Sequence, residues 1–136
     1  MVRLTSLADY AVVILAAAAK QGRVGRLSAA LLAEETGVPL PTVQKLLGRL
    51  AVAGLMESAR GSGGGFALAR PAEGISLAEI VEAVEGPIAM TACVETGRHD
   101  CALESGCRVR PHWAVVNGAI RGALAEVSLA RLAGEV

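Results

Sequence analysis

Apolar residues in the first part of the chain follow helical spacing. The run Ala11–Ala19 is apolar on most faces of a helix, so we predict a helix over about Ser6–Lys20 that is buried on more than one side. Ser6 and Asp9 stand three residues apart at its start, which is the spacing of a capping box with Asp in place of Glu. A polar, glycine-containing turn is expected to follow.

Two further helices are predicted close together. Ser28 can cap a short helix that Gly37 ends in a left-handed conformation. Pro39 and Pro41 fit at or before the first turn of a third helix, which we place at Thr42–Ala53. Its apolar positions, at spacings of three, one and three, make one buried stripe. That stripe consists of Val43, Leu46, Leu47 and Leu50.

The spacing then changes to that of strands. Leu55–Arg60 and Phe66–Arg70 are predicted to be two short strands, and the glycines of 61–65 supply the positive φ angles of a tight connection. The order helix, short helix, turn, helix and β-hairpin is typical of a winged helix-turn-helix. The predicted fold class is therefore mostly α with a small β-hairpin.

The second part of the chain continues with helices. Ser76 and Glu79 form a capping box for a helix over Leu77–Glu85, and the cysteine segment Ala92–Arg110 is expected to be a loop. A long final helix is predicted over about Pro111–Ala130, with a heptad-like seam suited to pairing with another helix. The seam consists of Trp113, Val116, Ile120, Leu124 and Val127. We divide the chain into a DNA-binding domain, 1–74, and a cysteine-loop and dimerisation region, 75–136.

Charge is distributed unevenly along the 136 residues. The net charge is zero, but residues 1–70 hold eight Lys/Arg against four Asp/Glu, and residues 71–136 hold five against nine. The first part is therefore +4 and the second −4, which suggests that the first part meets a polyanion. A solvated surface would give the same division.

The sequence begins without a secretory signal, and the run Ala11–Ala19 is too short to span a bilayer. We therefore expect a cytoplasmic protein with no membrane partner. In a reducing compartment, clustered cysteines favour metal binding or redox chemistry over structural disulfides.

Double-stranded DNA is the partner that the fold order and the charge division favour. The start of a recognition helix lies near base edges in the major groove, and a cation at a hairpin tip reaches phosphate or the minor groove. The alternative for the helix is an ordinary solvated face, and for the glycine-rich loop a nucleotide site, but it lacks the phosphate-loop lysine motif. The expected DNA contacts are Arg3, Thr42, Gln44, Lys45, Arg49, Arg60, Gly61, Ser62 and Gly63.

Three cysteines, Cys93, Cys101 and Cys107, fall within fifteen residues of an otherwise cysteine-free chain. Their C-x7-C-x5-C spacing lacks the close pairs of zinc sites and suits a loop around an iron–sulfur cluster. A fourth ligand must be another residue type or come from another chain, and the candidates are His99, Asp100, Glu104, His112 and the distant Asp9. Zinc, or a thiol switch without metal, stays open, as does a cluster-carrying redox protein that uses its helix-turn-helix for protein contact. No nucleophile–base pair is present, so we predict neither an enzyme nor a small-molecule substrate.

The chain resembles, from end to end, the winged-helix repressors of bacterial iron–sulfur and iron homeostasis, the group of IscR, NsrR, RirA and the Suf-operon regulators. The motifs that carry the resemblance are Arg3-Leu-Thr5, Asp9-Tyr-Ala11, the helix Leu40–Leu46, Arg60–Phe66 and Glu85-Gly-Pro87. The likeness to the Suf assembly regulators comes through Glu85–Ile88, Cys101–Glu104 and Cys107–Trp113.

The resemblance implies a repressor of assembly or iron genes, a homodimer built by the last helix, and Cys93, Cys101 and Cys107 as ligands of a 2Fe–2S or 4Fe–4S cluster. The IscR-type pattern has a histidine where this chain has Arg110, which cannot be a ligand. Asp9 matches an aspartate of the NsrR-type pattern, so the resemblance favours Asp9 of the partner subunit, with His112 second. Gln44 replaces a base-reading glutamate of IscR.

Overall fold

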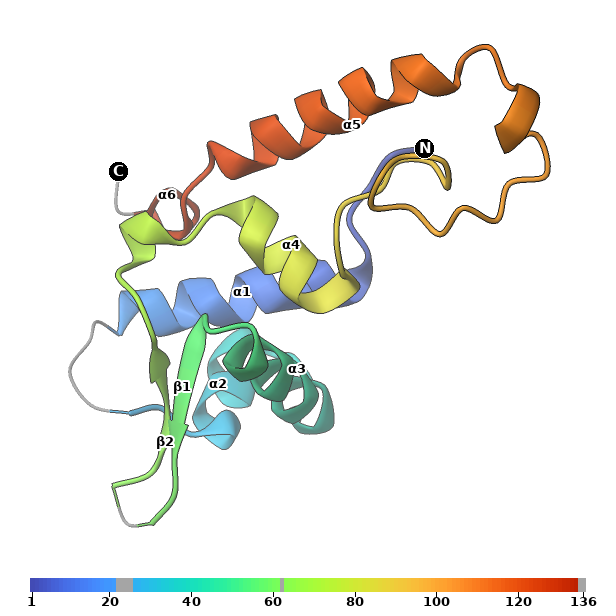
Figure 1. Ribbon diagram of the computed structural model, residues 1–136. Coiled ribbons are helices and arrows are strands. Elements are labelled where there is room, and N and C mark those ends of the chain that lie inside the picture. The colour runs from blue at the N-terminus through green and yellow to red at the C-terminus, as the bar shows by residue number, and fades with distance from the viewer. Residues whose placement is uncertain (22–25, 62, 135–136) are drawn as a thin grey trace.

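The computed structural model describes residues 1–21, 26–61 and 63–134. Its helices are α1 (Ser6–Lys20), α2 (Ala29–Thr36), α3 (Leu40–Val52), α4 (Leu77–Glu85), α5 (Arg110–Ala125) and α6 (Leu129–Leu132); two short 3-10 turns lie at Ala72–Gly74 and Glu104–Gly106, and the strands are β1 (Met56–Ala59) and β2 (Gly65–Leu68) (Figure 1). The strands pair antiparallel with Met56 opposite Leu68. The predicted fold class, helical with a small hairpin, is confirmed.

The helix ends follow from local hydrogen bonds. Ser28 caps α2, because its Oγ accepts from the N–H of Leu31 at 3.0 Å, and Gly37 ends that helix with φ +79°. Both predicted signals are confirmed. The cap predicted at Ser6 is wrong, because Ser6 is already helical and the residue before it, Thr5, accepts from the N–H of Ala8 at 3.1 Å.

The hydrophobic core is centred on α1, as its apolar pattern predicted. Helices α2 and α3 and strand β2 contact it on one side, and α4 and α6 contact it on the other (Figure 1). The fully or almost fully buried residues of α1 are Ala8, Ala11, Ile14, Leu15, Ala18 and Ala19. Residues of α4 and α6 belong to the same core, so the two regions predicted to meet at residue 74 pack together. The boundary itself stays a prediction.

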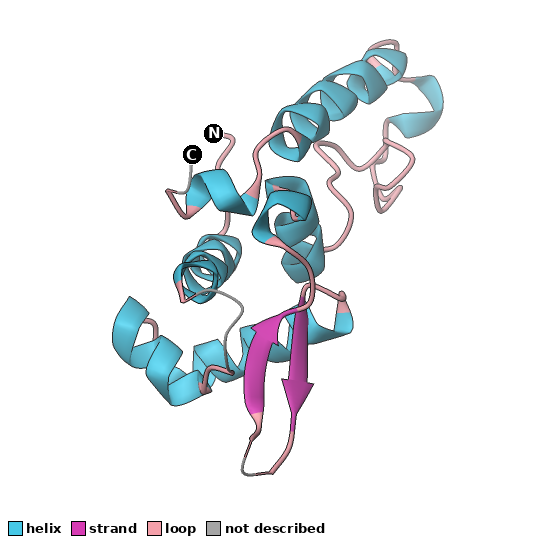
Figure 2. Cartoon of the chain, turned by 90° about the vertical axis from the view of Figure 1, so that its left-hand side faces the viewer, coloured by secondary structure: helices cyan, strands magenta, loops and turns pink. Residues whose placement is uncertain are grey.

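The hairpin extends beyond the helices (Figure 2). A third backbone segment supports it, because Leu27 and Phe66 exchange two N–H to carbonyl hydrogen bonds of 2.7 Å each. The strands are shorter than predicted. Gly65 is required where the segments meet: its φ is +120°, and a Cβ there would lie 2.8 Å from the Leu27 carbonyl oxygen.

The final helix is not continuous, which corrects the prediction of one helix to Ala130. The chain leaves α5 after Ala125 and pairs in extended form with the segment before α4. The N–H of Leu77 donates to Val127 and the N–H of Leu129 donates to Ile75, each at 2.8 Å. These tertiary bonds replace helical ones, and Ser128 then caps α6. None of the described helices has the length and apolarity that crossing a membrane requires.

The capping box of α4 is also tied to the base of the hairpin. The Glu79 carboxylate accepts from the Ser76 N–H at 2.9 Å and from Arg70, which follows β2, at 2.8 Å. Partial burial alone would raise the pKa of Glu79, but these hydrogen bonds outweigh it and lower the pKa.

We expect Glu79→Ala to lower the free energy of unfolding by about 1 kcal/mol at neutral pH, mainly through the lost cap, since an exposed ion pair contributes little. Urea unfolding measures this, with Glu34→Ala as control, because the exposed Glu34 makes no hydrogen bond or ion pair with the described residues. Because the pKa of Glu79 is lowered in the folded state, its charge stabilises the fold above the unfolded-state pKa of about 4.3. This stabilisation is lost as the pH falls through the folded-state pKa. A stability difference that persists undiminished in acid would contradict a role for the carboxylate charge.

Candidate functional site

Helix α3 divides cleanly into a buried and an exposed face. The predicted stripe of Val43, Leu46, Leu47 and Leu50 has no exposed surface. Thr42 is half-buried, while Gln44, Lys45, Gly48 and Arg49 are exposed on the remaining surface. The side chains of Gln44 and Lys45 make no hydrogen bond with the described residues, so both are available to a ligand.

Arg49 is placed differently from its neighbours on α3. Its Nη1 donates to the carbonyl oxygen of Val84, in the last turn of α4, at 3.0 Å. That carbonyl is one of those that a helix end leaves without a partner inside the helix. The structure therefore gives this cation a contact inside the protein.

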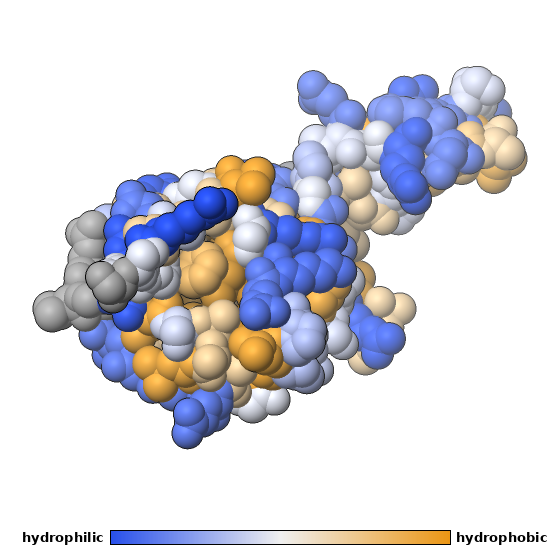
Figure 3. Space-filling model, turned by 90° about the horizontal axis from the view of Figure 1, so that it is seen from below, coloured by the Kyte–Doolittle hydropathy of each residue, from blue (hydrophilic) through white to orange (hydrophobic). Residues whose placement is uncertain are grey.

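The hairpin tip carries three more of the predicted DNA contacts, Arg60, Gly61 and Gly63. Arg60 and Gly63 are exposed, and Gly61, with φ +93°, accepts a backbone hydrogen bond from Gly64 at 2.9 Å. Ser62 lies outside the described residues. Seen from below, this face shows hydrophilic side chains beside apolar ones (Figure 3). Arg3 is not grouped with the tip, because the N-terminal segment lies at the other end of the molecule (Figures 1 and 2).

The cysteine segment is a loop, as predicted, interrupted by one short 3-10 turn. Cys93 and Cys107 are half-buried, Cys101 is exposed, and none of the three forms a disulfide. The Thr91 hydroxyl lies 3.3 Å from the Cys93 sulfur. Within residues 1–21, 26–61 and 63–134, no three His, Cys, Asp or Glu side chains are gathered closely enough to hold a metal ion. Thiolate donors suit iron, and in the described part of the chain they are not gathered into a site.

Gly97 shapes the turn around Cys93, and the sequence analysis missed it. The N–H of Gly97 donates to Val94 at 2.7 Å, and the next turn closes where His99 donates to Ala92 at 2.8 Å. A Cβ at Gly97 would lie 2.3 Å from the Ala92 carbonyl oxygen, so only glycine fits this backbone approach. Nothing in the sequence around Gly97 signals that contact.

Two of the fourth-ligand candidates, both in the loop, contact each other. The His99 Nδ1 lies 2.6 Å from the Glu104 carboxylate, and Arg110 lies 3.3 Å from the same oxygen. The hydrogen bond to Glu104 raises the pKa of the exposed His99. His112 and Asp9 are exposed, in the first turns of α5 and α1. Of the candidates for a fourth ligand, His99 and Glu104 are therefore already paired.

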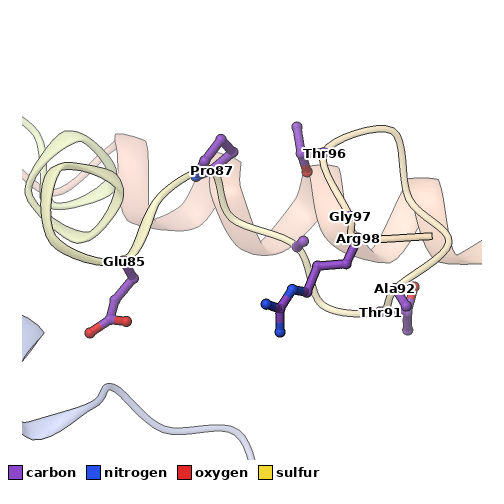
Figure 4. A pocket seen from close by; sticks show the side chains of 8 residues that line it. Glu85, Pro87, Thr91, Ala92, Thr96, Gly97 and Arg98 are labelled. Carbon is purple, nitrogen blue, oxygen red and sulfur yellow. The ribbon is translucent and has the colours of Figure 1, made fainter. Parts of the chain in front are cut away.

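The start of α1 lies against the end of α4, just before the loop that carries the cysteines. Thr5 donates its hydroxyl to the Glu85 carboxylate at 2.5 Å, which joins the cap of α1 to the last residue of α4. Beside it is an open pocket of about 530 Å³, into which the side chains of Glu85 and Arg98 both point (Figure 4). The cysteines thus follow directly after a segment that the N-terminus contacts.

Comparison with known proteins agrees with this architecture. Residues 4–135 match the Rrf2 family model, described as an iron-dependent transcriptional regulator. The regulator IscR of Photorhabdus laumondii is 34% identical over 130 residues, which cover 96% of this chain and 78% of that protein. The cysteine regulator CymR of B. subtilis superposes with a TM-score of 0.76 at 25% identity, covering 100% of this chain and 99% of that one. IscR of T. potens shares the fold, with a TM-score of 0.74 at 24% identity over 98% of this chain and 88% of that chain.

We expect Gly97→Ala to open the turn that holds Cys93. The added methyl group must displace the Ala92 backbone, at a cost of about 1–2 kcal/mol, which corresponds to a factor of roughly 5–30 in the population of the opened loop. Alkylation kinetics of Cys93, with the other two cysteines replaced by Ser, should accelerate accordingly. Gly106→Ala is the matched control, since a Cβ there meets nothing within 4 Å. Equal alkylation rates in both variants would show that the close approach does not hold the turn.

Proposed function

The chain belongs to the Rrf2 family of transcriptional regulators, and we propose that it is a repressor that senses an iron–sulfur cluster bound by Cys93, Cys101 and Cys107. One observation carries this proposal: all three thiols lie on one loop that begins at the end of α4, beside a winged helix-turn-helix. Genes of cluster assembly or iron homeostasis are the expected targets. Because these genes lie on the chromosome, the proposed protein acts in the cytoplasm.

For DNA binding, the exposed side chains of α3 enter the major groove. Gln44 suits adenine, Lys45 suits guanine or phosphate, and Thr42 lies in the first turn near them. Arg60 and the glycines of the hairpin tip contact phosphate or the minor groove. The positive charge of residues 1–70 supports this assignment, because phosphate contacts supply most of the affinity for DNA.

For cluster binding, the residue types fit and the loop must close around the group. Thiolates are the ligands that iron–sulfur clusters prefer, and metal sites seldom exist preformed without their metal. When bound, the cluster supplies a crosslink that oxygen, nitric oxide or iron shortage can remove. A fourth donor comes from Asp9 of the partner subunit, with His112 as the second choice, since His99 and Glu104 are already paired.

A homodimer is supported by the exposure of α5. None of its residues is buried, and Val116 of the predicted seam is 37% exposed, with Val115 beside it 73% exposed. Four of the five predicted seam residues lie on this helix, whereas Val127 follows it in the extended segment. An apolar helix of this kind gains stability by packing against a second copy. A two-fold dimer then presents two α3 helices to half-sites about one helical turn, roughly 34 Å, apart.

A thiol-redox or zinc-dependent regulator is the second candidate. The observation in its favour is that Cys101 is exposed and outside any disulfide, as an oxidation-sensitive thiol must be. The sulfur chemistry differs between the two candidates, while the DNA-binding surface is shared.

Anaerobic purification tests the cluster directly. We expect a brown protein with iron and acid-labile sulfide, loss of both in each Cys→Ser variant, and cluster affinity at least about tenfold lower in Asp9→Asn. Glu34→Gln, an exposed carboxylate elsewhere, is the control and should keep the cluster. A colourless protein that cannot be reconstituted with iron and sulfide overturns the proposal, and zinc in its place supports the second candidate.

The salt dependence of operator binding tests the hairpin contact. Arg60→Ala should weaken binding and reduce the slope of log K against log salt by about 0.9, the value for one phosphate contact. Arg131→Ala removes an exposed cation from α6 and should leave the slope unchanged. The same slope for Arg60→Ala and the wild type would place the hairpin away from the DNA backbone.

A further inference from the structure

Arg49 joins the recognition helix to the last turn of α4. Its guanidinium donates to the Val84 carbonyl at 3.0 Å, although Arg49 lies on the same exposed surface of α3 as Lys45. A cation is favourable at this place, because the carboxyl end of a helix carries partial negative charge and unpaired carbonyls. A shallow groove of about 600 Å³ lies on the surface where the two helices meet, and Arg49 and Val84 are among the residues that line it.

The same turn of α4 also binds the residues that lead from α4 into the cysteine segment. The Glu82 carboxylate accepts from the N–H of Ile88 at 2.9 Å and from Arg121 of α5 at 2.7 Å. Burial alone would raise the pKa of Glu82, but these hydrogen bonds lower it, so the carboxylate stays charged. The end of α4 is therefore bonded to α3, to α5 and to the loop.

The loop is bonded to α5 a few residues before Cys93. The carbonyl of Ile88 accepts from the Asn117 amide at 3.1 Å, and the N–H of Met90 donates to the same Asn117 at 2.8 Å. Thr96 donates to Ile88 as well, at 2.8 Å. Hydrogen bonds therefore connect the cysteine loop, through Ile88 and Glu82, to the last turn of α4, which Arg49 contacts.

We infer that Arg49 is a positioning residue, through which the state of the cysteine loop sets the orientation of the recognition helix. This role rests on the proposed function and adds to it the place where the two halves of the molecule communicate. It separates Arg49 from Lys45, a residue on the same helix surface whose side chain has no hydrogen bond to the described residues.

The test compares Arg49→Gln, Arg49→Lys and Lys45→Gln, each with and without the cluster, by operator titration at one salt concentration. The quantity measured is the ratio of operator affinities in the two states, for which allosteric proteins show about 5–150-fold. Arg49→Gln should reduce that ratio about three- to tenfold, the loss expected for one hydrogen bond of ordinary net strength. Arg49→Lys, which keeps the charge, should reduce it less. Lys45→Gln should weaken both states equally and leave the ratio unchanged.

Hydrogen exchange gives a second readout that does not need the cluster. In the cluster-free protein, amides of residues 85–90 should exchange faster in Arg49→Gln than in Lys45→Gln, because the end of α4 has lost its contact. A wild-type affinity ratio in Arg49→Gln, whatever the exchange rates, overturns the positioning role and leaves Arg49 as a phosphate contact. If the wild-type protein binds the operator with the same affinity with and without the cluster, both the sensing function and this inference are overturned.

Discussion

Helix α1 is buried on two sides, and that burial determines where the other elements lie. Small residues such as Ala11 and Ala18 let neighbouring helices approach closely, while Ile14 and Leu15 fill the space between layers. Burial of apolar area supplies about 25 cal/mol per Å², so a helix covered on both sides binds both layers firmly. Because α2, α3 and β2 share this helix with α4 and α6, the DNA-binding surface and the cysteine region are not loosely linked domains.

Polar contacts at the two ends of α4 join it to the elements on both sides of this shared core. At its beginning, Glu79 is bonded to Arg70, which follows β2. At its end, Val84 is bonded to α3, and Glu82 is bonded to α5 and the loop. The core fixes which elements touch, and these side chains add specific hydrogen bonds between them. Helix α4 thus lies between the two surfaces that the proposed function requires.

Local signals made most of the fold predictable. Ser28, Gly37 and Ser76 act within three or four residues of their helix ends, and the stripe of α3 repeats within the helix itself. The misplaced cap at Ser6 is an error of one residue in such a local signal. The early end of the last helix involves a contact that no local pattern contains, the bridge between Ser76 and Ser128.

In the candidate site too, local features were predictable and contacts between distant residues were not. The residue types of the cysteine loop and the exposed surface of α3 were predictable. The contact between Arg49 and a carbonyl 35 residues away was not, nor was the approach of Gly97 to the Ala92 backbone. Within the loop, His99 pairs with Glu104, and the spacing of these residues in the sequence does not predict that pair.

The extended pairing at residues 127–129 clamps one end of α5, whereas the far end carries the cysteine loop as an arm that stands apart from the body (Figure 3). At 1.5 Å per residue the 16 residues of α5 span about 24 Å, so tilting by about 5° at the clamp moves the far end by about 2 Å. Such a lever converts slight rocking at its pivot into displacements as large as a metal–sulfur bond. The position of the cysteine loop relative to the body therefore depends on the contacts that hold α5 in place, those of Arg121 and Asn117 as well as the clamp.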